Sequence, residues 1–401
     1  MANEYKEIHF WEFPPTRTFV KLNSKFRKGF FDAIMKEISF GEAAKILNEK
    51  SSDYSVKRSY HNGHLSSWKK GFKIDYGKKQ VVNIPLWVLI ELSKELSKNN
   101  DHRNRLMLEI EKNIISYSGL GKSLIITRPI LPILLTPEMV SILFHLCGDG
   151  HIGVDNSTSS YTQLSAEGLR NFKIKLENTF GKFEICRNQF KEGHLLIPRI
   201  ITDFYMRFFK VNDCGWDIAR IPDEIKNLPE NFLLAGLTSF LIDEGHIGDT
   251  IEFYSGNYLL LNDVRVIAIE LGYNCTPIKK KFRYGKFDLY RFYISLKSAE
   301  KLYHDINRLA KEFPTCGLAQ KSKNLNYIIE RRKRKWLYRE NGATKNMIIS
   351  LLKDEMTVKE LAKSLNIGFS STREHLYKLE KLGKIQKSGK IKQGFLWSIV
   401  K

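Results

Sequence analysis

The chain has 401 residues, and its 65 lysines and arginines against 44 aspartates and glutamates give a formal net charge of +21. Such an excess supplies salt-dependent affinity for phosphate groups and favours a nucleic-acid partner. The longest apolar stretch, residues 130–135, is too short to cross a membrane. The first residues lack a signal peptide's apolar core, and the five cysteines have no CxxC spacing. We therefore expect several domains, no zinc site or disulfide framework, and a cytoplasmic, nucleoid-associated location.

Residues 1–110 contain the first expected DNA-binding element. The stretch FGEAAKILNEKSSDYSVKRSYHNGHLSSWKKGF, followed by the helix PLWVLIELSKELSK, resembles a repressor-like helix-turn-helix region. Within it, Leu65–Lys70 is the expected recognition segment. The connection between the two helices is longer than is usual for that motif.

Two later segments end in the same way. SILFHLCGDGHIG (141–153) and GLTSFLIDEGHIG (236–248) each run from an apolar helix into an acid, Asp149 or Glu244, and then into Gly-His-Ile-Gly. A carboxylate at the C-terminal end of a helix faces the negative end of the helix dipole, which disfavours it unless a cation is present. Two such ends brought together predict a site for hard divalent cations.

Both apolar helices have clear start signals. Residues 136–138 (Thr-Pro-Glu) and 229–230 (Pro-Glu) open them, and neither helix has a polar face of ordinary width. The small residues Ser141 and Gly236, at equivalent positions, would let two buried backbones approach closely. A buried helix pair explains a single copy of this pattern, whereas the repetition and the paired acids favour a functional site.

The repetition continues beyond the two acids. Each acid is followed by two short strands, a helix, two further strands and a helix, and the second set is offset from the first by 95 residues (245 minus 150). The order αββαββα therefore occurs twice. We expect the two sheets to join into one long saddle with the acids at its centre.

The second unit contains a basic hairpin at residues 275–296 in which aromatic residues alternate with lysines and arginines. Because alternate side chains of a strand share one face, the basic residues can face a DNA major groove while the aromatics pack behind them. The predicted DNA contacts are Lys279, Lys280, Lys281, Arg283, Lys286 and Arg291. A solvated hairpin is the alternative.

The C-terminal part, residues 343–401, resembles a winged helix. Thr357 caps one helix, a recognition helix follows from Ser370, and a strand ribbon ends the chain. We place Ser371, Thr372 and Arg373 near DNA; a module for protein contact is the alternative. The basic run before this module is either a solvated helix face or a phosphate-backbone contact, and its predicted DNA-binding residues are Arg331, Arg332 and Arg334.

The paired motifs resemble the LAGLIDADG homing endonucleases of the single-chain kind, over about residues 132–334. Ile142–Gly150 and Leu237–Gly245 fall on the nine motif positions. The resemblance implies an α+β fold of two pseudo-symmetric αββαββα units, residues 132–228 and 229–334, flanked by small, mainly helical DNA-binding modules. The chain departs from the motif where Phe144 replaces a small third residue, where Cys147 and Ile242 replace a dispensable acid, and where Glu244 replaces Asp.

The same resemblance implies metal-dependent hydrolysis of double-stranded DNA at a long site by a monomer. It makes Asp149 and Glu244 catalytic and implies a metal site formed by Asp149, Glu244, Gly148 and Asp243, with Mg²⁺ as the expected cofactor. Family members also keep a basic residue at each site, for which the candidates are Lys321 and Arg220, with solvated charges as the alternative. His151 and His246 either approach a metal or phosphate or simply begin the following strands.

Two other functions stay open at this point. A transcription regulator that kept the saddle for binding without cutting would also combine this core with helix-turn-helix flanks. An RNA maturase is a third reading. Two acids facing phosphates bring no advantage to a pure DNA binder, which favours the nuclease.

Overall fold

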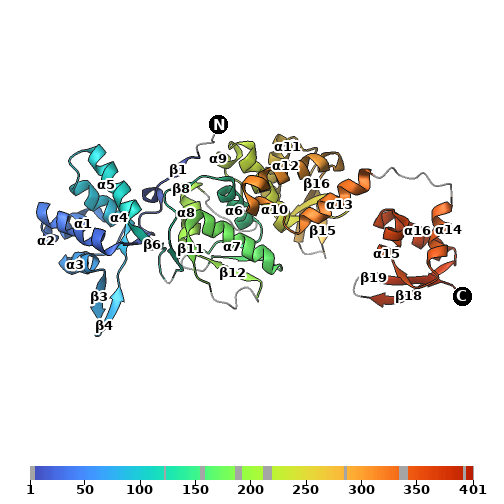
Figure 1. Cartoon of the computed structure of the whole chain (residues 1–401), viewed down its shortest axis with the longest axis horizontal. Coiled ribbons are helices and arrows are strands. Elements are labelled where there is room, and N and C mark those ends of the chain that lie inside the picture. Colours follow the sequence, from blue (N-terminus) through green and yellow to red (C-terminus); the bar gives the residue numbers. More distant parts are fainter. Residues whose placement is uncertain are drawn as a thin grey trace. The chain divides into compact units, whose positions relative to one another are not determined.

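The computed structural model describes residues 5–121, 123–153, 159–185, 192–210, 219–283, 287–333, 342–391 and 394–400. The chain forms two compact units, residues 1–246 with 251–322 and residues 247–250 with 323–401. Both mix helices with small sheets (Figure 1), so the predicted α+β class is confirmed at this level. The predicted end of the second repeat, residue 334, lies beyond the division between the units.

The first unit begins with a helical region made of α1 (Ser24–Glu37), α2 (Phe40–Lys50), α3 (Asn62–Lys70), α4 (Leu86–Glu95) and α5 (Asn100–Lys112). Asn23 caps α1, and Ser39 forms a capping box with Glu42 at the start of α2. Within α3, Leu65 and Trp68 are buried. These two residues of the predicted recognition segment Leu65–Lys70 therefore pack inward and are not available for DNA.

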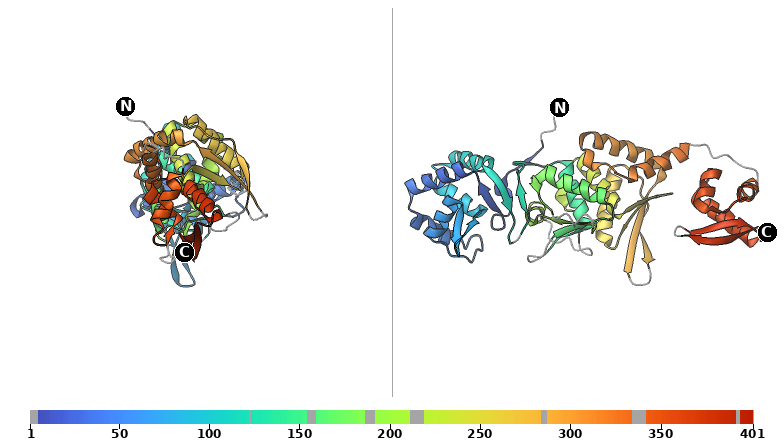
Figure 2. Two further views of the ribbon diagram at one scale, coloured as in Figure 1. Left: turned by 90° about the vertical axis from the view of Figure 1, so that its right-hand side faces the viewer. Right: turned by 60° about the horizontal axis from the view of Figure 1, so that its bottom comes forward.

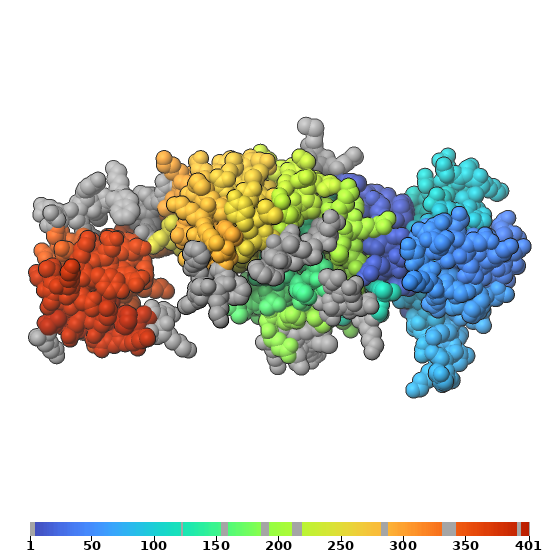
Figure 3. Space-filling model, turned by 180° about the vertical axis from the view of Figure 1, so that it is seen from behind, coloured from blue at the N-terminus to red at the C-terminus, as the bar shows by residue number. Residues whose placement is uncertain are grey.

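A hairpin that the sequence analysis did not predict follows α3. Strands β3 (Phe72–Asp75) and β4 (Lys78–Val81) pair antiparallel around Tyr76 and Gly77. Both turn residues have a positive φ, 47° and 74°, as in two-residue turns whose twist matches that of the strands. The hairpin projects from the surface of the first unit (Figure 3).

A five-stranded sheet joins the N-terminal region to the first repeat. Its order is β11-β7-β6-β2-β5, formed by β11 (Lys182–Phe183), β7 (Ile125–Thr127), β6 (Ile114–Ser118), β2 (Phe19–Leu22) and β5 (Ile84–Pro85). A short pair of β1 (Glu7–Ile8) with β8 (Ile133–Leu134) adds a second connection. The first repeat is therefore continuous with the N-terminal region rather than a separate domain.

Two successive segments share the predicted αββαββα order. The first contains α6 (Pro137–Cys147), β9 (Gly150–His151), β10 (Ser159–Thr162), α7 (Ala166–Phe180), β11, β12 (His194–Ile197) and α8 (Arg199–Phe208). The second contains α10 (Glu230–Glu244), β13 (Gly245–Ile247), β14 (Ile251–Ser255), α11 (Tyr258–Glu270), β15 (Lys279–Arg283), β16 (Phe287–Ile294) and α12 (Ala299–Glu312). The short α9 (Asp223–Lys226) lies between them.

The predicted strand pairing is wrong in two respects. In the first repeat, β11 does not pair with β12: it pairs with β7, whose Thr127 also donates a side-chain hydrogen bond to Lys182 O. An upstream strand thus occupies the edge that the prediction gave to β12, which pairs with β10 instead. The two repeats also form separate sheets, β12-β10-β9 and β13-β14-β16-β15, and not one continuous sheet.

The β15–β16 hairpin extends well beyond the helices around it (Figure 2).

Helices α6 and α10 pack against each other; α6 is almost entirely buried, and so is the stretch Phe232–Leu241 of α10. A Cβ at Gly236 would lie 2.4 Å from the Phe144 ring, so the larger side chain on α6 occupies the space that the glycine on α10 leaves. This explains how Phe144 is accommodated at a position expected to be small. Ser141 is fully buried and donates to Glu138 O, which satisfies its hydroxyl within the helix.

The second unit contains most of α13 (Lys321–Lys333) and a C-terminal module of α14 (Ala343–Leu351), β17 (Met356–Thr357), α15 (Val358–Leu365), α16 (Phe369–Lys381), β18 (Ile385–Ile391) and β19 (Gly394–Ile399). The strand order β17-β19-β18 and the preceding helices give the predicted winged-helix topology. Its core includes Leu365, Leu376 and Leu379, together with Trp397.

Candidate active site

The acids Asp149 and Glu244 stand at the C-terminal ends of the two packed helices. Asp149 follows α6 by two residues, and Glu244 is the last residue of α10. Burial raises the pKa of Asp149 to about 7, and the charge of Asp243 adds to the effect. Burial also raises the pKa of Glu244 to about 7, reinforced by Asp149 and then Asp243. The two helices therefore bring three carboxyl groups within electrostatic range of one another.

Asp243 has a different environment from its two neighbours. Its side chain is fully buried, and both oxygens accept hydrogen bonds: Tyr161 donates to Oδ1 at 2.6 Å and Gln163 Nε2 to the same oxygen at 3.0 Å. Oδ2 lies 2.8 Å from His145 Nδ1. This geometry favours an internal, positioning role over the predicted role of Asp243 as a metal ligand. Gly148, the other predicted neighbour, lies so close to Asp243 that a Cβ there would be 3.0 Å from it.

A buried lysine completes this network. Lys175, on α7, is 1% exposed, and its ammonium lies 2.8 Å from His145 Nε2 and 3.3 Å from Ser239 Oγ. An ammonium can only donate, so His145 Nε2 accepts and the imidazole keeps its proton on Nδ1, facing Asp243. Burial and the Lys175 charge hold the pKa of His145 well below its ordinary value. The helices are thus joined by a chain of charged and polar contacts running from Lys175 through His145 to Asp243.

Lys321 caps the end of α10. Its ammonium donates to Ile242 O at 2.6 Å, Gly245 O at 2.6 Å and Leu241 O at 2.9 Å. A cation at this end of a helix satisfies free carbonyl groups and interacts favourably with the dipole. It also lowers the pKa of all three carboxyl groups relative to burial alone. Lys321 is therefore at the predicted site, and it is not a solvated charge.

Asp149 and Asp243 border a cavity of about 560 Å³. Asp149, Asp243 and Lys321 line one part of it, and the segment around Gln163 and residues 192–193 lines another. Gln320 closes one side by donating to Ser165 Oγ and to Glu167.

The remaining predicted residues of this site lie elsewhere. Arg220 makes a bidentate contact with Asp263 on α11, at 2.6 and 2.8 Å, and nothing brings it to Asp149. In this position the arginine braces α11 against the segment between the repeats, and its catalytic role stays a prediction. His151 and His246 are both exposed at the first strand after each acid, which agrees with the reading that they only begin these strands.

The donor set is compatible with one divalent cation. If all three carboxyl groups are ionised, their charge exceeds that of Lys175 and Lys321 by one, because His145 is neutral. Carboxylates whose pKa values are raised by one another gain from a neighbouring cation, and carboxylate oxygens are the ligands that Mg²⁺ prefers. Within the described residues, however, no group of three or more His, Cys, Asp or Glu side chains is arranged to hold a metal ion. A divalent cation held by Asp149 and Glu244 would need water or phosphate oxygens to complete its coordination.

The basic hairpin has two distinct faces. Phe253 and Phe292 stack at 4.8 Å on the buried face, as the prediction that aromatics pack behind the charges requires. Lys279 pairs with Arg291 across the strands, and with Lys281 both belong to the opposite face. Lys280 lies on the same face as Phe292 and forms an ion pair with Asp288 at 2.6 Å. The Arg283 side chain and all of Lys286 lie outside the described residues.

In the C-terminal module, one predicted DNA contact is wrong. Thr372 is fully buried and donates to Gly368 O, so it faces the core of the module. Arg373 is exposed and lies over the Tyr377 ring at 5.5 Å, and Ser371 is half-buried beside it. The side chains of Arg331 and Arg332, and Arg334 as a whole, lie outside the described residues.

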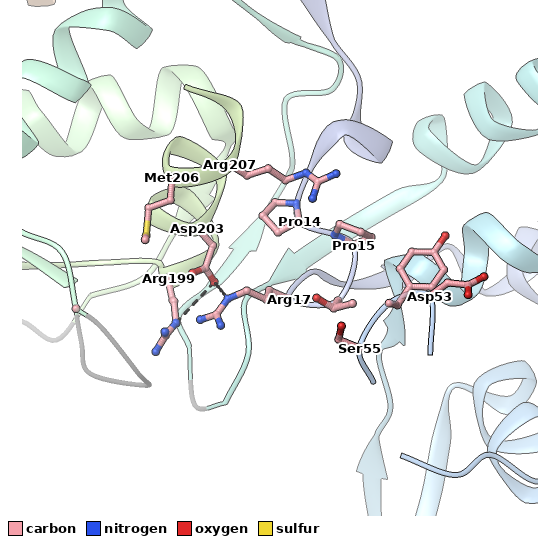
Figure 4. A pocket seen from close by; sticks show the side chains of 12 residues that line it. Pro14, Pro15, Arg17, Asp53, Ser55, Arg199, Asp203, Met206 and Arg207 are labelled. Carbon is pink, nitrogen blue, oxygen red and sulfur yellow. Dashed lines mark ion pairs between the residues drawn. The ribbon is translucent and has the colours of Figure 1, made fainter. Parts of the chain in front are cut away.

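A second, basic pocket of about 550 Å³ lies between the N-terminal segment and α8 (Figure 4). Asp203 sits between Arg17, at 2.9 Å, and Arg199, at 3.6 Å, while Arg207 also lines the pocket. None of its lining residues belongs to the acid site. The ion pairs join the N-terminal segment to the first repeat.

Among the described helices, none is long and apolar enough to span a membrane.

Comparison with known proteins gives a partial assignment. Residues 344–387 match the family described as bacterial regulatory protein, arsR family, so the C-terminal module carries a helix-turn-helix DNA-binding motif. The chain is also similar to the crystal structure of full-length DUF199/WhiA from Thermatoga maritima. The identity is 14%, the likeness covers 62% of this chain and 92% of that chain, and the TM-score is 0.30, too low to support any argument. No curated protein matches the chain.

Proposed function

We propose that this chain is a metal-dependent, site-specific endonuclease of double-stranded DNA, built like the LAGLIDADG homing endonucleases. The observation that carries the proposal is the pairing of Asp149 and Glu244 at the ends of packed helices, where each acid stands at the same place in a repeated αββαββα order. If the two helices only formed part of the core, nothing would require an acid at the C-terminal end of each.

In this proposal, Asp149 and Glu244 hold Mg²⁺, which when bound supplies a Lewis acid for activating water and stabilising the leaving oxygen. Asp243 and its partners His145 and Tyr161 fix the end of α10 so that Glu244 keeps its position. Lys321 neutralises part of the charge of the acids when no cation is bound.

The DNA would lie across the strand faces of the two repeats. The face of the β15–β16 hairpin with Lys279, Lys281 and Arg291 offers positive charge on a flat, twisted surface that suits the major groove. The helix-turn-helix motif of the C-terminal module supports DNA as the partner and extends the contacted site. Since both acids come from one chain, a monomer is sufficient for cleavage.

The second candidate is a DNA-binding transcription regulator that does not cut. It is favoured by the match of residues 344–387 to a family of bacterial regulators and by the absence of a ready three-ligand metal group among the described residues. In that case the acids would be buried charges that only destabilise the fold. An RNA maturase has no specific observation in its favour.

The decisive experiment is incubation of the protein with a random duplex DNA library and Mg²⁺, followed by sequencing of new ends. The wild type is compared with Asp149→Asn and Glu244→Gln, and with Glu192→Gln as a control that removes an exposed acid from the same cavity. The nuclease requires cleavage by the wild type and the control only. Specific binding by the wild type without cutting in any divalent metal would support the regulator instead.

A further inference from the structure

We infer that α1, α2, α3 and the β3–β4 hairpin form a second winged-helix-like surface for duplex DNA, besides the C-terminal module. The exposed side of α3 would enter the major groove, and the hairpin would contact the phosphate backbone beside it. The inference rests on the proposed function only in taking duplex DNA as the partner; it does not depend on cleavage.

The order of elements supports this assignment. In the C-terminal module, α14, α15 and α16 are followed by the β18–β19 hairpin, and this module carries the helix-turn-helix motif. Residues 24–81 repeat that order, with α3 in the position of the recognition helix and β3–β4 in that of the wing. The N-terminal copy lacks an equivalent of β17, so its hairpin is a two-stranded sheet.

The three helices hold α3 and the hairpin in a fixed relation. Arg27 on α1 is buried and donates to Lys70 O at 3.0 Å and Lys69 O at 3.2 Å, at the C-terminal end of α3. Gly71, which follows, has φ of 78°, and a Cβ there would lie 2.4 Å from the Arg27 guanidinium. The turn from α3 into the hairpin is therefore specified by a close contact that only glycine permits. Such a rigid connection is what a wing needs to stand at a constant distance from the helix.

The charge on this surface matches a phosphate backbone. A groove of about 650 Å³ runs beside α3 and the base of the hairpin, and its basic or imidazole side chains are Arg58, His61, His64 and Lys73. None of the described residues that line the groove is acidic. Lys70, Lys78 and Lys79 add exposed positive charges along α3 and the hairpin, whereas the Lys73 ammonium forms an ion pair with Asp75 at 3.1 Å. A groove with this excess of positive charge attracts a polyanion and repels a basic protein surface.

The exposed side chains of the hairpin add an observation of a different kind. Ile74 is 72% exposed, Val81 65% and Tyr76 fully exposed. Three large apolar side chains on one isolated hairpin are unusual for a solvated loop and are expected where a partner covers them. Tyr76 also carries a hydroxyl that can donate to a phosphate oxygen. The basic groove beside them favours DNA as that partner.

The test uses the full chain with Asp149→Asn and Glu244→Gln, without divalent metal, so that no cleavage occurs. Binding of a labelled random-sequence 40-base-pair duplex is measured over a range of salt concentrations. Lys73→Ala with Lys78→Ala removes two charges from the proposed surface. Lys98→Ala with Lys112→Ala removes two exposed charges at the ends of α5, the helix that lies on the side away from the hairpin (Figure 1). Hydrogen exchange of residues 61–81 is followed with and without the duplex.

We expect the slope of log K against log[salt] to fall by about 2 in the Lys73 and Lys78 variant and to stay unchanged in the control. Residues 61–81 should gain protection when the duplex is added. An unchanged slope in the Lys73 and Lys78 variant, or no added protection of residues 61–81, would overturn the inference. Because the binding test does not require cleavage, failure of the nuclease proposal and failure of this inference give different results.

Discussion

At the scale of single residues, the acid site combines groups that disfavour one another's charge. Asp149 and Glu244 are partly buried beside Asp243, and each has its pKa raised to about 7. Lys321 offsets part of this repulsion while it satisfies the last carbonyls of α10. The site is therefore less stable without a cation than with one, which is what a metal-binding site requires and a purely structural site does not.

The pH dependence of stability tests this description. The pKa of Asp149 is about 7 in the folded chain and near 3.8 when unfolded. The stability that its proton contributes is therefore present at low pH and lost as pH rises through 7. Asn carries no charge at any pH, so the stability of Asp149→Asn relative to the wild type should increase from pH 5 to pH 8 by roughly 1–3 kcal/mol.

Urea unfolding without divalent metal at the two pH values measures this difference. The exposed Glu192→Gln serves as the reference for a charge removed from the same cavity, and it should show no such change. If the free energy of unfolding differs between Asp149→Asn and the wild type by the same amount at both pH values, then Asp149 is neither buried nor repelled by Asp243 as described.

Replacement of Lys321 by Met should destabilise the fold by roughly 2–4 kcal/mol, because three carbonyl groups lose a charged donor and three acids lose a compensating charge. Lys323→Met removes an exposed lysine two residues further along α13 and should change stability little. Chemical denaturation of both variants provides the comparison. Equal stability of the two would show that the cap contributes nothing.

The residues of this site differ in how far the sequence could reveal them. The pairing of Asp149 with Glu244 could be recognised because each acid is followed by Gly-His-Ile-Gly, and Lys321, which was expected beside them, caps the end of α10. Lys175 was missed, although it occupies the apolar stripe of α7 beside Phe172 and Leu176. Its partner His145 lies in an otherwise apolar helix. Single polar residues on apolar faces do not reveal their partners, because those come from distant elements.

At the scale of elements, the packing of α6 on α10 depends on one complementary pair of side chains. Phe144 lies over Gly236, and no other residue type leaves the same space. We expect Gly236→Ala to destabilise the protein by about 1–3 kcal/mol, because the new methyl group overlaps a ring in a packed interior. Thermal or urea unfolding measures the change.

Gly29→Ala is the matched control, since Gly29 lies inside α1 with nothing within 4 Å of the added methyl group. That variant should be as stable as the wild type or more stable by up to about 1 kcal/mol, because alanine favours helix. Combining Gly236→Ala with Phe144→Leu should recover part of the loss. No recovery would indicate that the strain arises elsewhere in the helix pair.

Element order was predictable here, but strand partners were not. The caps and apolar runs located α6 and α10, and both halves keep the αββαββα order. The pairing of β11 with β7 depends on a strand outside the repeat, which local patterns do not report. The β3–β4 hairpin escaped prediction because its strands are short and exposed and its turn residues, Tyr76 and Gly77, resemble a common loop.

At the scale of the whole molecule, DNA binding draws on the net charge of +21 and on a C-terminal module with a helix-turn-helix motif. We expect Arg373→Ala to reduce the slope of log K against log[salt] for a random duplex by about 1, because one phosphate or base contact is lost. Lys353→Ala, an exposed lysine after α14, is the control of equal charge and should leave the slope unchanged. Equal slopes for both variants would place the recognition helix elsewhere.

The central claim is that Asp149 and Glu244 jointly hold a divalent cation. Electron paramagnetic resonance of Mn²⁺, titrated into the wild type, the double variant Asp149→Asn with Glu244→Gln, and Glu192→Gln, tests it without knowledge of the DNA target. We predict bound Mn²⁺ in the wild type and in Glu192→Gln, and only free Mn²⁺ in the double variant. Equal binding by all three proteins, or none by the wild type even with duplex DNA present, would contradict the claim.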